Sequence, residues 1–159
     1  DGAGIWTLVR DSGVLDLNSA YLYLLLCKDF ADTCRVAEAD GRLVGFVTAY
    51  RPPGKPDTLF VWQIGVAASQ RGQGLGGRLL RALLGADACR GVSALETTIS
   101  PSNAPSRGLF ESLARRLDAD IAEEPCFEAD IFPEEGHEAE PLLRIGPFTE
   151  ERRAALSAD

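Results

Sequence analysis

A glycine-rich stretch, Val66-Ala67-Ala68-Ser69-Gln70-Arg71-Gly72-Gln73-Gly74-Leu75-Gly76-Gly77, decides how the rest of this chain is interpreted. The residues before it, 58–65, are β-branched and aromatic, which predicts a strand. The residues after it, 78–84, are apolar at helical spacing with arginines on the other face, which predicts a helix. The glycines therefore lead from a strand into a helix N-terminus. Free backbone N–H groups and the helix dipole make such a loop a predicted anion site.

Two common phosphate loops fit this stretch poorly. A P-loop would close with Gly-Lys-Ser/Thr, and the stretch contains no lysine. Gly72, Gly74 and Gly77 match the dinucleotide pattern G-x-G-x-x-G, and Glu96 follows Gly77 by 19 positions. That fold, however, places its first glycine at the strand end, whereas five residues separate Val66 from Gly72. A glycine-rich helix start without a ligand is a further alternative, although glycines are costly in the first turns of a helix.

A third pattern, Arg71-x-x-Gly74-x-Gly76 with Gln70 ahead of it, resembles the acetyl-coenzyme A pyrophosphate loop of the GNAT acetyltransferases. The preceding strand and the following helix agree with that resemblance. It implies that acetyl-CoA is the cosubstrate and that its pyrophosphate is bound by Arg71, Gly72, Gln73, Gly74, Leu75, Gly76 and Gly77.

Composition favours one globular domain. The chain has 159 residues, of which 45% are hydrophobic and 25% charged. We expect a single domain over residues 1–148 and a charged tail over 149–159 that frays. The net charge of −8 argues against nucleic acid or an anionic membrane as a partner. No apolar run approaches the ~20 residues that span a bilayer, and no signal segment is evident.

The cysteine and histidine content predicts no metal site. Cys27, Cys34, Cys89 and Cys126 form no C-x-x-C pair, and the chain has a single histidine. We expect these cysteines to be buried, reduced thiols in a cytoplasmic protein.

The hydrophobic pattern predicts two helices before the glycine stretch in the sequence and two that begin in it or follow it. A short helix is expected from 5 to 10 and another from 20 to 30. The second is apolar nearly all round, so we expect it to be buried on more than one side and to form the interface of a homodimer. Later helices are expected from the glycines to about Leu84 and from 104 to 117.

The strands predict an α/β (α+β) fold: a mixed, largely antiparallel central sheet with helices on both faces. Asp40-Gly41 predicts a hairpin. The expected strands are 33–39, 42–50, 59–66, 94–99, 126–132 and 140–145. This order resembles the GNAT fold, whose usual first strand would lie before Asp1.

The GNAT resemblance has implications beyond the glycine loop. In that family the two central parallel strands splay and the pantetheine arm enters the gap, so backbone groups of Ile64 and Val66 are expected to bind it. The backbone N–H of Val66 could also stabilise the thioester oxyanion. Asn103-x-x-Ser106-x-x-x-Phe110 resembles the family's second cofactor motif. Phe110 departs from the usual tyrosine, which removes a candidate acid, but a thiol with a pKa near ~8.5 can leave without one.

A narrower resemblance covers nearly the whole chain. It is to the L-2,4-diaminobutyrate acetyltransferases, which acetylate the γ-amine of diaminobutyrate to give the precursor of the osmoprotectant ectoine. The matching stretches are Leu15-Asp16-Leu17-Asn18-Ser19-x-Tyr21, Phe30-Ala31-Asp32-Thr33, Tyr50-Arg51-Pro52-Pro53, Asp57-Thr58-Leu59-Phe60-Val61-Trp62-Gln63, Glu96-Thr97-Thr98-x-x-Pro101-Ser102-Asn103 and His137-Glu138-x-Glu140-x-Leu142-x-Arg144-Ile145.

The residues in these stretches suit a small diamino acid. Asp16 and Glu140 could bind its ammonium groups, Trp62 could form a wall, and Tyr21 and His137 could donate to its carboxylate. Simpler structural explanations stay open. Asp16 could only cap a helix, Trp62 and Tyr21 could be core, and His137 and Glu140 could be an exposed loop residue and a strand-edge charge.

The expected mechanism is direct transfer within a ternary complex, because no cysteine lies in a recognisable nucleophile arrangement. Glu140 is the first candidate for the base that deprotonates the amine. Glu96 could act as a base through water, or could only order a neighbouring loop. Two alternatives remain at this stage: an acyl-CoA-binding GNAT sensor without turnover, and an acetyltransferase for other small or peptide amines.

Overall fold

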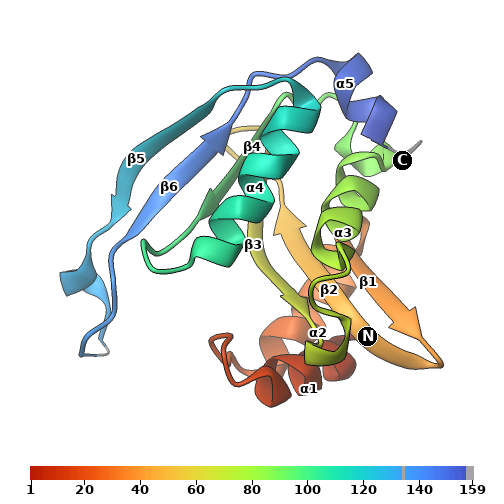
Figure 1. Cartoon of the computed structure of the whole chain (residues 1–159), viewed down its shortest axis with the longest axis vertical. Helices are drawn as coiled ribbons and strands as arrows, with labels where there is room; N and C mark the ends of the chain where they lie inside the picture. Colours follow the sequence, from red (N-terminus) through yellow and green to blue (C-terminus); the bar gives the residue numbers. More distant parts are fainter. Residues whose placement is uncertain (134, 157–159) are drawn as a thin grey trace.

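The computed structural model describes residues 1–133 and 135–156. In these residues one six-stranded sheet has the order β1-β2-β3-β4-β6-β5 (Figure 1). Its strands are β1 Cys34–Ala39, β2 Arg42–Tyr50, β3 Thr58–Val66, β4 Ala94–Thr98, β5 Ile121–Phe127 and β6 Glu140–Ile145. The longer helices are α1 Gly2–Ser12, α2 Ala20–Asp29, α3 Leu75–Leu84 and α4 Ala104–Leu117, followed by the short α5 Glu150–Ala155.

Helices cover both faces of the sheet. Neighbouring strand residues point to opposite faces, and Phe46 and Val47 of β2 belong to different hydrophobic clusters. Phe46 packs in the cluster of α1 and α2, whereas Val47 packs in the larger cluster of α3 and α4. This arrangement confirms the predicted fold class.

The central strands β3 and β4 form the sheet's one parallel pair among the described residues, and it is short. Thr58, Leu59 and Phe60 pair with Ala94, Leu95 and Glu96. Beyond this point β3 pairs with β2 alone and β4 with β6 alone. Figure 1 shows the two strands diverging toward the end of the sheet where the α1–α2 loop lies.

A β-bulge interrupts β3 at Trp62. Thr48 of β2 is opposite Gln63 while Ala49 is opposite Val61, so Trp62 is the additional residue. The bulge turns two successive side chains to the side of α2. The Trp62 ring lies 5.9 Å from that of Tyr23, and the Tyr23 hydroxyl donates to Oε1 of Gln63 at 2.9 Å.

One predicted strand is largely wrong. Sequence patterning placed it over 126–132, whereas β5 spans Ile121–Phe127 and a 3₁₀ turn follows at Ala129–Ile131. Every residue of β5 is exposed. A strand that buries neither face lacks the alternation on which the prediction relied, and the apolar Phe127 and Ile131 stay at the surface.

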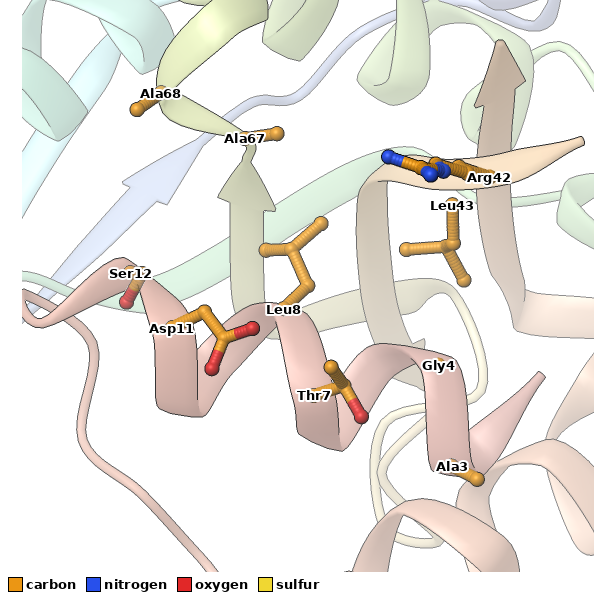
Figure 2. Close-up of a pocket in the computed structure, with 10 residues that line it drawn as sticks. All are labelled: Ala3, Gly4, Thr7, Leu8, Asp11, Ser12, Arg42, Leu43, Ala67 and Ala68. Carbon is orange, nitrogen blue, oxygen red and sulfur yellow. The ribbon is translucent and has the colours of Figure 1, made fainter. Parts of the chain in front are cut away.

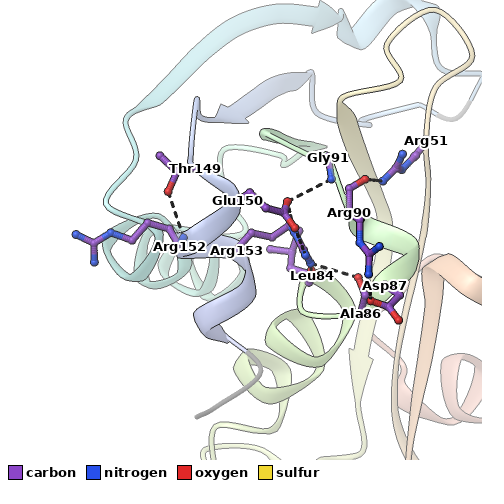
Figure 3. Close-up of polar contacts among 10 residues, drawn as sticks. All are labelled: Arg51, Leu84, Ala86, Asp87, Arg90, Gly91, Thr149, Glu150, Arg152 and Arg153. Carbon is purple, nitrogen blue, oxygen red and sulfur yellow. Dashed lines mark hydrogen bonds and ion pairs between the residues drawn. The ribbon is translucent and has the colours of Figure 1, made fainter.

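The fraying expected for the tail is also wrong as far as residue 156, because residues 150–155 form α5. Arg153 is 4% exposed, and its guanidinium donates to the carbonyls of Leu84 and Ala86 and to both oxygens of Glu150 (Figure 3). The bond from Arg153 is the main cause that lowers the pKa of Glu150 to about 2, with a further contribution from the Gly91 N–H. Alanine-rich composition gave no indication of this buried arginine. The last three residues lie outside the described part.

Helix α2 is less buried than its sequence indicated. Only Tyr23 and Leu26 of α2 are buried. Tyr21 and Leu24 are 68% and 51% exposed, and Phe30, which caps the C-terminus of the helix, is 42% exposed. Within one copy of the described chain, burial on several sides is therefore wrong.

The cysteine prediction holds in part. All four thiols are free, but only Cys34 and Cys89 are buried, and Cys126 is exposed. In the described part, no helix has both the length and the apolar character needed to cross a bilayer.

Candidate active site

The glycine loop joins β3 to α3 as predicted. It contains a 3₁₀ turn at Ala68–Gln70, and Gly74 is the N-cap of α3 with φ of 72°. The N–H of Arg78 donates to the carbonyl of Gly74. The N–H groups of Leu75, Gly76 and Gly77 precede that first helical bond, so they are free to bind an anion.

The loop leaves room for such an anion. A Cβ atom at Gly72 would meet nothing within 4 Å, and one at Gly74 would meet only the Arg78 guanidinium at 3.9 Å. Gly76, by contrast, packs against Leu109 of α4. The Nε of Arg71 donates to the carbonyl of Val66 at 3.3 Å, which folds the loop back onto β3. These residues fit a pyrophosphate.

The backbone of β3 beside the loop has an open edge. The N–H of Ala67 donates to Val44 of β2, so the pair Val66–Gly45 one step earlier is of the non-hydrogen-bonded type. The N–H and C=O of Val66, and by the same alternation those of Ile64, therefore point away from β2, and the Val66 carbonyl accepts from Arg71. That edge faces the side from which β4 has parted.

The three residues of the second cofactor motif are placed differently from one another. Asn103 caps α4, and its side-chain oxygen accepts the N–H of Ser106 at 3.2 Å. Phe110 is 2% exposed and belongs to the core cluster under α3 and α4. A side chain this buried has no free surface to offer a cofactor, so the structure gives Phe110 a packing role.

Three predicted substrate residues gather at the α1–α2 end. Trp62 is half-buried, whereas Tyr21 and Asp16 are exposed. The loop that carries Asp16 is fixed to β3 because Nε2 of Gln63 donates to the Asp16 carbonyl at 3.2 Å. Gln63 also accepts the Tyr23 hydroxyl, so it connects the Asp16 loop to α2.

His137 and Glu140 lie on the β5–β6 side. The His137 ring stacks on Phe132 with centroids 3.7 Å apart, and its Nδ1 lies 2.7 Å from the Glu138 carbonyl. A carbonyl can only accept, so Nδ1 carries the proton. Neutral His137 then presents a lone pair at Nε2, and it can donate there only when protonated. Glu140 is the first residue of β6 and accepts the Thr98 hydroxyl at 2.5 Å.

Glu96 is held by two cations. Its side chain is 5% exposed, Nζ of Lys55 lies 2.9 and 3.0 Å from its two oxygens, and Arg144 donates to Oε1 at 2.5 Å. Both oxygens are therefore engaged. These contacts argue against Glu96 as a base and favour the alternative that it orders the loop of Lys55.

Cys126 lies close enough to both carboxylates to respond to them. Partial desolvation of this largely exposed thiol raises its pKa, the charges of Glu96 and Glu140 raise it further, and Lys55 opposes them. A thiol kept protonated is a poor nucleophile. This agrees with the expectation of direct transfer.

The predicted substrate residues thus fall into two groups. One lies at the α1–α2 end and the other at the start of β6. Sequence reasoning missed Gln63, Thr98, Lys55 and Arg144. Three of these lie within stretches already noted for their resemblance, but only the folded contacts show which carboxylate or loop each one holds.

A separate cavity of about 610 Å³ lies between α1, the β1–β2 turn and the start of the glycine loop (Figure 2). Its lining includes Thr7, Asp11, Arg42 and Ala67, and none of the predicted site residues. We therefore do not assign it to the active site.

The family follows from the match of residues 5–114 to the acetyltransferase (GNAT) family model. The matched region includes the glycine loop, both central strands and most of α4. The chain belongs to the GNAT acetyltransferase family.

Similar proteins define the group within that family. An L-2,4-diaminobutyric acid acetyltransferase of Marinococcus halophilus is 54% identical over 94% of this chain and 86% of its own length. One of Nocardia farcinica is 51% identical over 96% and 79%. A diaminobutyrate acetyltransferase structure from Paenibacillus lautus, with L-2,4-diaminobutyric acid and coenzyme A, matches with a TM-score of 0.90 at 48% identity, over 94% of this chain and 90% of that one. This chain belongs with the L-2,4-diaminobutyric acid acetyltransferases.

Replacing Gly74 by aspartate should weaken acetyl-CoA binding at least about tenfold, a loss of about 1.4 kcal/mol. The carboxylate would stand at the positive end of α3, repel the pyrophosphate and occupy its approach. Isothermal titration calorimetry with acetyl-CoA measures the change.

Gly41→Asp is the matched control, because Gly41 also has φ of 72° and open space around its Cβ position. It adds the same charge and backbone strain in the β1–β2 turn. Equal affinities of the two folded variants would contradict the assignment of the loop.

Proposed function

We propose that this protein transfers the acetyl group of acetyl-CoA to the γ(N4)-amine of L-2,4-diaminobutyrate in the cytoplasm, and that the N4-acetyl product is used in ectoine biosynthesis. The chain's membership of the diaminobutyrate acetyltransferases supports the reaction. The observation that carries the proposal is the open edge of β3, which ends in an anion-binding loop, together with a carboxylate, Glu140, held by Thr98 at the end of β4.

The cosubstrate side is built mainly from backbone groups. The N–H groups at the start of α3 bind the pyrophosphate, and the open edge at Ile64 and Val66 pairs with the pantetheine arm. Acetyl-CoA supplies the activated acetyl group when bound. The N–H of Val66 donates to the thioester oxygen as negative charge develops there, without needing to reorganise.

The acceptor side is built from side chains. Trp62 provides the wall, and Asp16 and Glu140 bind ammonium groups. Tyr21 and protonated His137 donate to the carboxylate. An amine that lacks the carboxylate would leave these donors without a partner, which favours an amino acid as the acceptor.

Glu140 takes the proton from the γ-ammonium, directly or through water. The amine has no lone pair to attack with until that proton leaves. Glu140 suits this role because its described hydrogen bond comes from a neutral hydroxyl, whereas Glu96 is held by Lys55 and Arg144.

The direct test is incubation of the purified protein with acetyl-CoA and L-2,4-diaminobutyrate, with the acetylated nitrogen identified by NMR. The expected product is the N4-acetyl compound. Binding of acetyl-CoA without turnover would indicate a sensor, and preference for a peptide amine would indicate a different acetyltransferase. Either result would overturn the proposal.

Glu140→Gln should lower kcat by about 10²–10⁴-fold, because glutamine keeps the shape but cannot take a proton. The loss should shrink at higher pH, where more free amine is present. Steady-state kinetics over a pH series measure both effects. A higher KM with unchanged kcat would mean that Glu140 only binds the ammonium group.

Glu124→Gln is a suitable control. Glu124 is exposed on β5, opposite Leu142 of β6, so its loss removes a negative charge from the neighbouring strand. Its kcat should stay within about twofold of the original, since a surface substitution of this kind has a small effect.

We also propose that the protein is a homodimer whose interface includes α2. The exposed apolar side chains Leu24 and Phe30 support this, because a helix that leaves such surface uncovered in one copy gains by pairing with another. Partner contact on α2 would also lie next to the Asp16 loop.

Sedimentation velocity at micromolar concentration should give the mass of a dimer for the original chain. Leu24→Glu should shift it toward monomer because a carboxylate would be buried without a partner. Ala154→Glu, at an exposed position of α5 far from α2 in Figure 1, should stay dimeric. A monomer for the original chain would contradict the proposal.

A further inference from the structure

Thr98 is the last residue of β4, at the point where this strand has already left β3. It pairs with Leu142 of β6, and its hydroxyl reaches back along β6 to Glu140. The Oγ1–Oε2 distance is 2.5 Å. An ionised carboxylate can only accept, so the hydroxyl is the donor. The strand end and the candidate base are thus joined by one side-chain hydrogen bond.

This bond lies on the face of the sheet that α1 and α2 cover, where we place the amine substrate. Leu95 belongs to the core cluster of α3 and α4, and Thr97 beside it is 4% exposed. Successive strand residues alternate, so Glu96 and Thr98 point to the opposite face. That is also the face on which Trp62 contacts Tyr23 of α2.

The hydroxyl differs in kind from the donors that hold Glu96. Lys55 and Arg144 compensate the charge of Glu96. A neutral donor instead fixes the direction of a carboxylate and leaves its negative charge available to a proton. Threonine adds rigidity, because its branched Cβ restricts χ1 and the residue is held in a strand.

We infer that Thr98 is a positioning residue for the acetyl transfer: it holds Oε2 of Glu140 so that Oε1 faces the substrate amine. This inference rests on the proposed function of Glu140. Thr98 does not touch the reacting atoms, and its whole effect passes through the carboxylate. Its loss should therefore slow the chemical step without weakening substrate binding in proportion.

The test compares Thr98→Val, which keeps the shape and removes the hydroxyl, with Thr98→Ser, which keeps the hydroxyl. Thr98→Val should lower kcat by about 10- to 100-fold, the effect of losing a hydrogen bond to a charged group. Its KM should change by less than about threefold. Thr98→Ser should recover most of the rate.

Thr97→Val is the matched control on the same strand, because the Thr97 hydroxyl contacts only the neighbouring Thr98 carbonyl among described groups, at 3.5 Å. It should keep kcat near the original. Thermal melting of each variant separates a loss of fold from a loss of positioning, and Thr98→Ser provides a second folded variant for comparison.

A double mutant separates this inference from the proposed function. Thr98→Val should add no further loss to Glu140→Gln, because both changes act on one group. Additive losses, an unchanged kcat in Thr98→Val, or a Thr98→Ser variant as slow as Thr98→Val would each overturn the inference while leaving Glu140 as the base. An unchanged kcat in Glu140→Gln would overturn the base assignment itself, and the positioning role with it.

Discussion

The structure depends on the parting of β3 and β4 after the pair Phe60–Glu96. A sheet that opens at its centre loses backbone hydrogen bonds, so other contacts must hold the two halves together. On one face the core under α3 and α4 does this, with Leu59, Val61 and Leu95 in one cluster. On the other face Glu96 connects the Lys55 loop and Arg144 of β6 at the last paired position. The opening is therefore kept at a fixed place along the sheet, and the backbone beyond it is left for a ligand.

The two halves of the opening have different chemistry and different sequence character. The cosubstrate half consists of backbone groups and glycines, and it falls within the region matched by the general family model, residues 5–114. The acceptor side as proposed uses side chains. His137 and Glu140 lie beyond the matched region, whereas Asp16, Tyr21 and Trp62 lie within it. A shared acetyl donor needs a shared backbone geometry, whereas each acceptor needs its own charges. The bulge at Trp62 belongs to the acceptor side, because it turns two neighbouring residues of β3 toward α2.

Local signals predicted much of this fold. The Asp40-Gly41 hairpin, α4 and β6 agree with their expected bounds because turn residues and apolar spacing mark them. β5 was misplaced since an exposed edge strand has no such pattern, and α5 was missed since one buried arginine decides it. The glycine loop was recognisable as an anion site, and the substrate residues were suggested by resemblance. The partners of Glu96 and Glu140 were not predictable, because they come from positions 41 to 48 residues away that meet only when the strands and the Lys55 loop are assembled.

Helix α3 connects the loop to the far end of the molecule. Its first turn presents free N–H groups, and the carbonyls of Leu84 and Ala86 at its other end accept from Arg153 of α5. An anion at the first turn and a cation at the last both stabilise the same dipole. Arg153 therefore supplies a buried cation at the end of α3 where the dipole is negative, while the opposite end meets the glycine loop. A short C-terminal helix thus completes the far end of the helix whose first turn carries the glycine loop.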